Sequence, residues 1–412
     1  MRSDEISVPG GRGPQRPVVR GIVAVALAAL LTAPAAGCRD GKSGGAGAGA
    51  PAASPTGPHL GAVVTAPAAD AVNVPPMTPV TFTTELADKA AVTVADAKGA
   101  AVAGKLSGDG GRWVPAGPLR WGTKYTATVT VTGADGQTAT AGSSFTVMKE
   151  PSTLVSATSH LGDGATVGVG MPLMIRFGRT IPQEKRDDVQ RRMAVASSPV
   201  QAGAWSWQDG QTVHYRPKVF WQAGSRITYR VALRGLPLGG GWYGANDLKV
   251  HVNIGSAVVM NVDNRTKTMT VTQDGAVVRK IPVSLGKPKS PSSYGTMVVM
   301  EKLAKTVFDT FEELGPKEGY RTKIDYAQRL TWGGEFIHSA PWSVKDQGKR
   351  NVSHGCVNMS PANAKWLFGL TKIGDPVTVK GTEVPLRSGN GWTHWNVSWS
   401  QYANGSALPV KG

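Results

Sequence analysis

The chain has 412 residues and a formal net charge of +17, with 45 Lys and Arg against 28 Asp and Glu, and it contains only two cysteines. This length is sufficient for about two to four domains, and 41% hydrophobic residues exclude a wholly disordered chain. Two cysteines exclude a disulfide framework and leave few ways to build a cysteine-rich metal site.

Residues 1–37 have the organisation of an export signal. Basic residues precede the apolar stretch 21–33, and small residues lead directly to Cys38. The apolar stretch fits a secretory signal and is short for a membrane span. Because a cysteine follows Ala-Ala-Gly at once, the segment resembles a bacterial lipoprotein signal, in which Cys38 is lipidated and becomes the first residue. Plain secretion with an incidental cysteine is the alternative.

Loss of residues 1–37 leaves a net charge of +15, so the positive charge belongs to the exported part. Nucleic acid is not expected as a partner, because the sequence has no zinc-finger spacing, RNA-binding aromatic motif or basic helix. A basic surface is attracted to an anionic envelope over a screened range of about 8–10 Å, although improved solubility explains the charge equally well. We expect a lipid-anchored chain on the extracytoplasmic face of the cell membrane, facing the wall.

The next segments predict a tether followed by β-rich domains. Residues 38–59 are nearly all Gly, Ala, Ser and Pro, which is typical of a flexible linker. Residues 60–149 contain short Val-, Thr- and Tyr-rich runs separated by turn signals, and residues 150–253 repeat this pattern. Such spacing predicts two tandem immunoglobulin-like β-sandwiches. Residues 183–192 are charged on most sides and predict a solvated surface helix.

A third, β-rich domain is predicted over residues 254–381. Two of its strand candidates are joined at residues 273–275 by Gln-Asp-Gly, a strong hairpin signal. Residues 302–330 show no clean periodicity and suit a long functional loop. Ser360 precedes a proline at a suitable first helical position, so a short helix is expected over residues 361–370.

The C-terminal tail, residues 382–412, carries Trp392, Trp395 and Trp399 within eight residues and no regular secondary structure is expected there. Tryptophans at this density are expected to anchor the tail to a domain face in preference to binding a ligand. The chain as a whole is therefore predicted to be mainly β.

One segment contains the residues of a chemical site. Cys356 is the only cysteine after Cys38 and lies within Ser-His-Gly-Cys-Val-Asn, residues 353–358. A thiol attacks a carbonyl well when a nearby imidazole takes its proton, and His338 ends an apolar run upstream. A buried structural cysteine is one alternative. A zinc site of His338, His354 and Cys356 is another, although it lacks a Cys-x-x-Cys pair.

His338-Ser339, thirteen further residues, and then Ser353-His354-Gly355-Cys356-Val357-Asn358 resemble the active-site signature of the bacterial L,D-transpeptidases with a YkuD-type catalytic domain. The order of lipoprotein signal, two immunoglobulin-like domains, catalytic domain and Trp-rich tail is similar to that of actinobacterial members. The resemblance therefore covers nearly the whole mature chain.

The resemblance implies a role for each residue of the signature. Cys356 would be the nucleophile and His338 the base. Ser339 would orient His338 through its backbone carbonyl. His354 would lie near the substrate, Asn358 would hydrogen-bond to the loop, and the N–H groups of Gly355 and Cys356 would form the oxyanion hole.

Four further positions are candidate substrate-binding residues. Tyr320 matches a lid tyrosine, Gly334 would let the substrate backbone approach, Trp342 would line the cleft, and Ser353 would contact the substrate. The alternatives are a tyrosine of the core or surface, an ordinary strand glycine, and a tryptophan that only packs under the loop.

The function implied is the formation of 3→3 cross-links between peptidoglycan stem peptides, with release of D-Ala, in wall biogenesis and cell-shape maintenance. Carbapenem-type β-lactams are the expected covalent inhibitors, and no cofactor is expected. With water as the acceptor, the same site would give an L,D-carboxypeptidase. A non-catalytic wall-binding lipoprotein and a zinc hydrolase are the competing classes.

Overall fold

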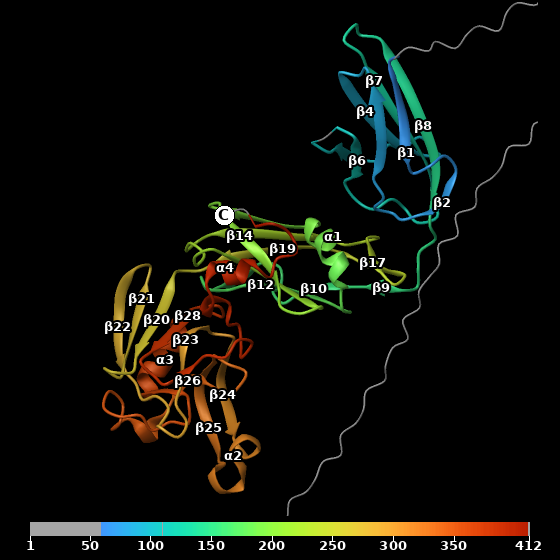
Figure 1. The fold of residues 1–412 in the computed structure, drawn as a ribbon. Helices are drawn as coiled ribbons and strands as arrows, with labels where there is room; N and C mark the ends of the chain where they lie inside the picture. Colours follow the sequence, from blue (N-terminus) through green and yellow to red (C-terminus); the bar gives the residue numbers. More distant parts are fainter. Residues whose placement is uncertain (1–58, 109, 411–412) are drawn as a thin grey trace, which may run out of the picture. The chain divides into compact units, whose positions relative to one another are not determined.

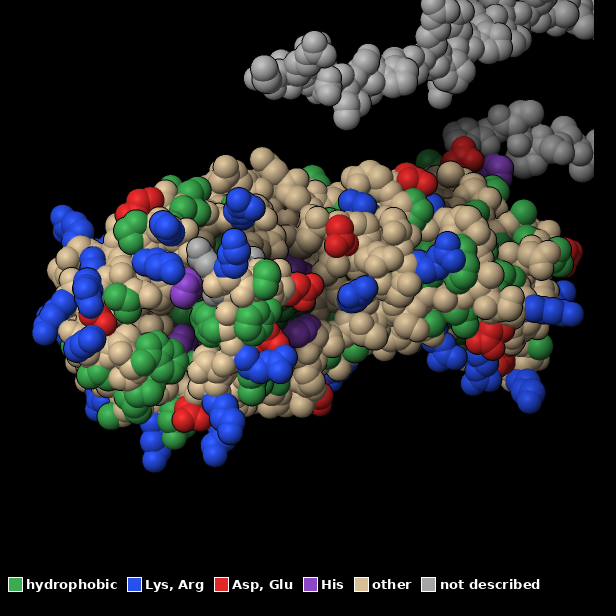
Figure 2. Space-filling model, turned by 90° about the horizontal axis from the view of Figure 1, so that it is seen from below, with side chains coloured by type: hydrophobic (Ala, Val, Ile, Leu, Met, Phe, Trp, Pro, Cys, Tyr) green, Lys and Arg blue, Asp and Glu red, His purple; other side chains and the backbone are tan. Residues whose placement is uncertain are grey.

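The computed structural model describes residues 59–108 and 110–410 (Figure 1). The predicted signal, Cys38 and nearly all of the predicted tether lie outside the described residues. Within the described part, no helix combines the length and apolar character that a membrane span needs. On the face seen in Figure 2, Lys and Arg side chains are spread widely and do not form a single patch.

The first β-rich segment forms a sandwich of two four-stranded sheets. One sheet has the order β1 (Gly61–Ala66), β3 (Val80–Glu85), β6 (Arg112–Pro115), β5 (Gly104–Leu106). The other has the order β2 (Ala71–Val74), β8 (Thr138–Val147), β7 (Lys124–Thr132), β4 (Lys89–Asp96). Alternate residues of β7, from Tyr125 to Val131, are buried, as expected where one face of a sheet covers a core.

The second segment forms another sandwich, which confirms the predicted pair of immunoglobulin-like units. Its sheets have the orders β10-β12-β15-β14 and β11-β19-β16-β13, and a small sheet β17-β18-β9 lies beside them. The strands are β9 (Leu154–Val155), β10 (Ala157–Ser159), β11 (Ala165–Val167), β12 (Leu173–Phe177), β13 (Met193–Ser198), β14 (Gly203–Trp207), β15 (Thr212–Pro217), β16 (Arg226–Ala232), β17 (Pro237–Gly239), β18 (Trp242–Gly244) and β19 (Asp247–Ile254).

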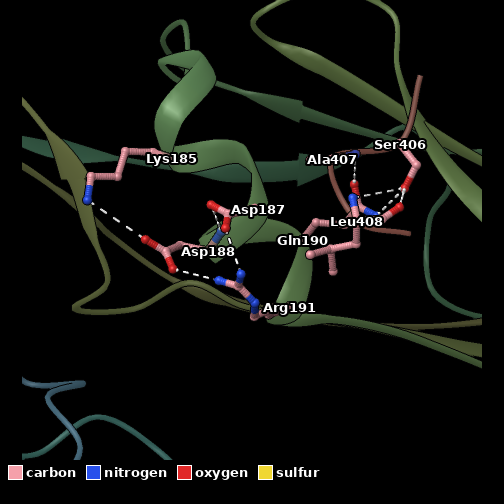
Figure 3. A network of polar contacts seen from close by, with 8 residues as sticks. All are labelled: Lys185, Asp187, Asp188, Gln190, Arg191, Ser406, Ala407 and Leu408. Carbon is pink, nitrogen blue, oxygen red and sulfur yellow. Dashed lines mark hydrogen bonds and ion pairs between the residues drawn. The ribbon is translucent and has the colours of Figure 1, made fainter. Parts of the chain in front are cut away.

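The helix predicted at residues 183–192 is present as a 3-10 turn, η1 (Gln183–Lys185), followed by α1 (Arg186–Arg191). Exposed ion pairs join Lys185, Asp187, Asp188 and Arg191 (Figure 3). The expectation of a solvated helix is wrong for the opposite side, because Val189 and Gln190 are buried. Gln190 donates to Ser406 Oγ at 2.7 Å and accepts from Ala407 N at 2.9 Å, so this helix binds the C-terminal segment.

The third β-rich region contains two further sheets around one apolar core. The six-stranded sheet has the order β22 (Ala276–Pro282), β21 (Thr268–Gln273), β20 (Val258–Asp263), β28 (Pro376–Lys380), β23 (Ser293–Val298), β29 (Val384–Pro385). The four-stranded sheet has the order β24 (Glu301–Asp309), β25 (Arg321–Arg329), β26 (Phe336–Ser339), β27 (Val357–Met359). Met260, Ile337 and Leu367 belong to one buried cluster, and Leu367 comes from α3 (Pro361–Leu370).

Two local predictions in this region are confirmed. Asp274 and Gly275 form the two-residue turn between β21 and β22, and both have positive φ, 50° and 87°, as the common hairpin turn requires. Helix α3 begins after Ser360, whose side chain accepts a hydrogen bond from Asn363 N.

The prediction of a long loop at residues 302–330 is wrong. The segment forms an antiparallel hairpin, β24 and β25, joined through α2 (Phe311–Glu318). Most residues of β24 are exposed or half-buried. Because neither face of this strand is fully covered, the alternation of polar and apolar residues that marks a half-buried strand does not develop.

The C-terminal tail packs on the second sandwich, as predicted, but it does contain regular structure: η3 (His394–Asn396) and α4 (Trp399–Ala403). Arg216, on β15, is only 2% exposed. Its guanidinium lies 4.5 Å from the ring centroids of both Trp395 and Tyr402 and donates to Val397 O at 3.3 Å. These cation–π contacts and hydrogen bonds anchor the tail.

Candidate active site

Strand pairing places His338 on β26 and Cys356 at the entry to the neighbouring strand, β27. Cys356 immediately precedes β27, which runs parallel to β26 with His338 opposite Asn358. The turn before the cysteine depends on Gly355, whose φ of 126° lies in a region that side-chain-bearing residues rarely adopt. The sequence Gly-Cys therefore gives a sharp entry into β27 and brings the thiol to the end of the strand.

Hydrogen bonds within the loop fix its conformation. Ser353 Oγ donates to Cys356 O at 2.7 Å and accepts from Gly355 N at 3.2 Å. The Gly355 N–H, which was expected in the oxyanion hole, is therefore engaged inside the loop, and so is the Ser353 hydroxyl. No hydrogen bond of the Cys356 N–H is found among the described residues. This N–H is the donor that can face a developing oxyanion.

His338 is held in one tautomer. Its Nδ1 lies 2.8 Å from Ser339 O, and a carbonyl can only accept, so Nδ1 carries the proton and Nε2 is left as an acceptor. Burial lowers the pKa of His338 to about 4, while the hydrogen bond to Ser339 acts in the opposite direction. The imidazole is therefore neutral at neutral pH and can take a proton at Nε2.

Cys356 is a free cysteine whose Sγ lies 3.6 Å from Gly334 O. Burial raises the pKa of its thiol to about 12; the Phe336 N–H opposes this rise, and the Glu335 charge adds to it. With the pKa values of Cys356 and His338 shifted in these directions, the resting pair is a thiol and a neutral imidazole. The thiolate must form when a substrate is present.

Two cavities, of about 240 and 340 Å³, meet at Cys356. Both are lined by Phe308, Tyr320, His354 and Cys356. The Tyr320 ring lies 5.5 Å from that of His354, at the end of the β24–β25 hairpin. Tyr320 therefore lies at both cavities beside Cys356, and its role as a lid residue stays a prediction.

The other predicted residues divide between the two cavities. Gly334 lines the first, in the turn before β26 and outside the strand, with a φ of 86°. His338, Trp342, Ser353 and Asn358 line the second. Trp342 is 54% exposed, so it does not simply pack under the loop. Asn358 Nδ2 lies 3.3 Å from Ser343 Oγ, in the turn η2 (Pro341–Ser343).

The zinc alternative has no support from the arrangement of side chains. Across residues 59–108 and 110–410, no group of three or more His, Cys, Asp or Glu side chains is arranged to hold a metal ion. His338, His354 and Cys356 therefore do not form such a group.

Four residues near the site were not singled out from the sequence. Lys287 Nζ lies 2.8 Å from His354 Nε2. Ser292 Oγ donates to Gly355 O at 2.6 Å, and Glu335 Oε1 accepts from Ser293 Oγ at 2.8 Å. Ser292 and Ser293 follow the Gly- and Pro-rich break after β22, and Glu335 lies three residues before His338. Their position in the sequence gives no signal of these contacts.

Comparisons with known proteins agree with this arrangement. Residues 71–237 match the bacterial Ig domain family, and residues 257–379 match the L,D-transpeptidase catalytic domain family. The chain is 36% identical over 341 residues to L,D-transpeptidase 2 of Mycobacterium tuberculosis, which covers 82% of this chain and 83% of the relative. It is 32% identical over 355 residues to L,D-transpeptidase 5 of the same species, covering 83% and 76%.

Solved structures give partial matches. An L,D-transpeptidase from Mycobacterium smegmatis is 36% identical and has a TM-score of 0.46, covering 56% of this chain and 100% of that chain. An LD transpeptidase in complex with imipenem is 32% identical and has a TM-score of 0.47 with the same coverage.

The neutral thiol–imidazole pair predicts an unusual pH dependence of alkylation. With a pKa of about 12 for Cys356, the rate of reaction with iodoacetamide should keep rising through pH 10, because the thiolate fraction increases about tenfold per pH unit below the pKa. The rate is measured by mass spectrometry on soluble protein that begins after Cys38.

His338→Ala is the matched control for this profile, because a neutral histidine stabilises no thiolate. The variant should keep the profile of the wild type. A plateau with a midpoint at or below about 8.5, the pKa of an ordinary cysteine, would contradict the assignment, particularly if His338→Ala abolished it.

Proposed function

The chain belongs to the L,D-transpeptidase family, and from this premise we propose that it forms 3→3 cross-links between peptidoglycan stem peptides through a thioester on Cys356. One observation carries the proposal: Cys356 and a tautomerically fixed, neutral His338 line the same cavity. A thiol beside an oriented base is the arrangement that acyl transfer requires.

In the first half-reaction, Cys356 Sγ attacks the carbonyl carbon between the diamino acid at stem position three and D-Ala at position four. The thiol proton passes to His338 Nε2. The tetrahedral oxyanion is stabilised by the Cys356 N–H, and a donor at such a position is worth about 3–4 kcal/mol of barrier. The C–N bond then breaks, His338 protonates the leaving amine, and D-Ala departs.

In the second half-reaction, the side-chain amine of a diamino acid in another stem attacks the thioester. His338 Nε2 takes the amine proton and returns it to the leaving sulfur, so one group acts as base and acid in turn. The new amide completes the cross-link and restores the thiol. Two cavities that meet at Cys356 support separate approaches for the donor and acceptor stems.

The acceptor of the acyl group is either the amine of a second stem or water. If water replaces the amine, the same thioester is hydrolysed and the activity is that of an L,D-carboxypeptidase. Tyr320 and Phe308 line both cavities at the thiol, and exclusion of water by such groups favours the amine.

The proposal extends to inhibitors and to location. A carbapenem-type β-lactam presents a strained carbonyl to the same thiol and would acylate Cys356 by the first half-reaction.

Lipidation of Cys38, suggested by the N-terminal signal pattern, would hold the chain on the outer side of the membrane. The long Gly- and Pro-rich segment after it would let the catalytic domain reach the wall.

Product analysis tests the reaction. Soluble protein incubated with disaccharide-tetrapeptide should yield a cross-linked dimer and free D-Ala, separated by chromatography and identified by mass. Cys356→Ala should yield neither. D-Ala released without dimer would show a carboxypeptidase, and no reaction in the wild type would refute the proposal.

Substitutions at His338 and Ser339 distinguish the role of the His338 imidazole from that of the Ser339 hydroxyl. His338→Ala removes the base and should lower the rate of dimer formation by about 10²–10⁴-fold. Ser339→Ala keeps the backbone carbonyl that holds Nδ1 and should change the rate only about twofold. A loss in Ser339→Ala as large as that in His338→Ala would show that the hydroxyl, and not the carbonyl, is the group that matters.

A further inference from the structure

Glu335 lies between the two backbone groups nearest the thiol. The carbonyl of Gly334 accepts from Cys356 Sγ at 3.6 Å, and the N–H of Phe336 acts on the same sulfur. The main chain of Glu335 is itself fixed, because its N–H donates to Thr331 Oγ1 at 3.0 Å and its carbonyl accepts from Leu330 N at 2.9 Å. Any movement of this residue would move both groups that contact the thiol.

The side chain of Glu335 is anchored by a single residue. Its Oε1 accepts from Ser293 N at 3.0 Å and from Ser293 Oγ at 2.8 Å. Burial raises the pKa of the Glu335 carboxyl, and the two hydrogen bonds from Ser293 oppose the rise. Among the described residues no ion pair with Glu335 is found. The two hydrogen bonds from Ser293 therefore offset the cost of keeping this half-buried carboxylate charged and hold it in one place.

Ser292, the residue before Ser293, hydrogen-bonds to the loop on the other side of the site. Ser292 Oγ donates to Gly355 O at 2.6 Å and accepts from Gly286 N at 2.9 Å. Ser292 and Ser293 therefore join the loop that carries the nucleophile to the turn that faces it. We call this pair with Glu335 the serine bridge.

We propose that Glu335 is a positioning residue for Cys356. Through its hydrogen bonds to Ser293, Glu335 holds the Gly334–Phe336 backbone at a fixed distance from the thiol. The inference rests on the proposed function, in which Cys356 is acylated. Acylation needs the sulfur, the carbonyl carbon and the oxyanion donor in one alignment, and a misplacement of about 1 Å can cost about 10²-fold. A small unselective electrophile has no such requirement.

The test compares Glu335→Ala with Glu335→Gln, and Glu383→Gln, at the start of the C-terminal tail, serves as an exposed control. Each soluble protein is treated with imipenem, which requires alignment, and separately with iodoacetamide, which does not. In Glu335→Ala the imipenem acylation rate should fall about 10–100-fold, while the alkylation rate should rise because the thiol is less confined. Glu335→Gln keeps an acceptor for both Ser293 donors and should restore acylation.

Several results would overturn the inference: equal changes of the two rates in Glu335→Ala, no change in either, or a Glu335→Gln variant as slow in acylation as Glu335→Ala. If Glu335→Ala does not fold, Ser293→Ala tests the inference in its place. This substitution removes the Ser293 hydroxyl, one of the two donors to Glu335, and should give a smaller loss of imipenem acylation with alkylation preserved. Failure of wild-type protein to react with imipenem would instead count against the proposed function. The Glu335→Ala alkylation rate would then decide the inference, since a thiol released from the serine bridge must be alkylated faster.

Discussion

The parallel pairing of β26 with β27 holds the whole site together. Its register puts Ile337 beside Val357 in the apolar core and His338 beside Asn358 at the cavity. His338 and the entry to β27 at Cys356 are thus fixed by the same strands that close the core, while the β24–β25 hairpin and the serine bridge are arranged around them. A site on packed strands keeps its geometry better than one on free loops.

Burial determines the protonation states of His338 and Cys356. It disfavours the charged form of both groups, so the pKa of His338 falls and the pKa of Cys356 rises. A protonated thiol is a poor target for oxidants, so the raised pKa also protects Cys356 from oxidation. Reactivity then depends on the substrate, whose carbonyl must arrive before transfer of the proton to His338 becomes favourable.

The features of the fold and of the site that depend on neighbouring residues could be predicted from the sequence. The turn at Asp274-Gly275 and the N-cap at Ser360 need only neighbouring residues, and the signature around Cys356 is compact. The β24–β25 hairpin was not predicted because β24 is exposed or half-buried along its whole length and lacks the alternation of a half-buried strand. The contact between Glu335 and Ser293 joins residues 42 positions apart, and the engagement of the Gly355 N–H depends on a loop conformation that spacing does not reveal.

The central claim is that Cys356 carries the acyl group while His338 moves the proton. Peptide mapping by mass spectrometry, after brief exposure of soluble protein to a tetrapeptide stem, tests it most directly. The account predicts that the mass of the acyl-tripeptide appears on the peptide containing Cys356 in the wild type and is nearly absent in His338→Ala. Release of D-Ala with no adduct on that peptide, or an adduct on another residue, would contradict it.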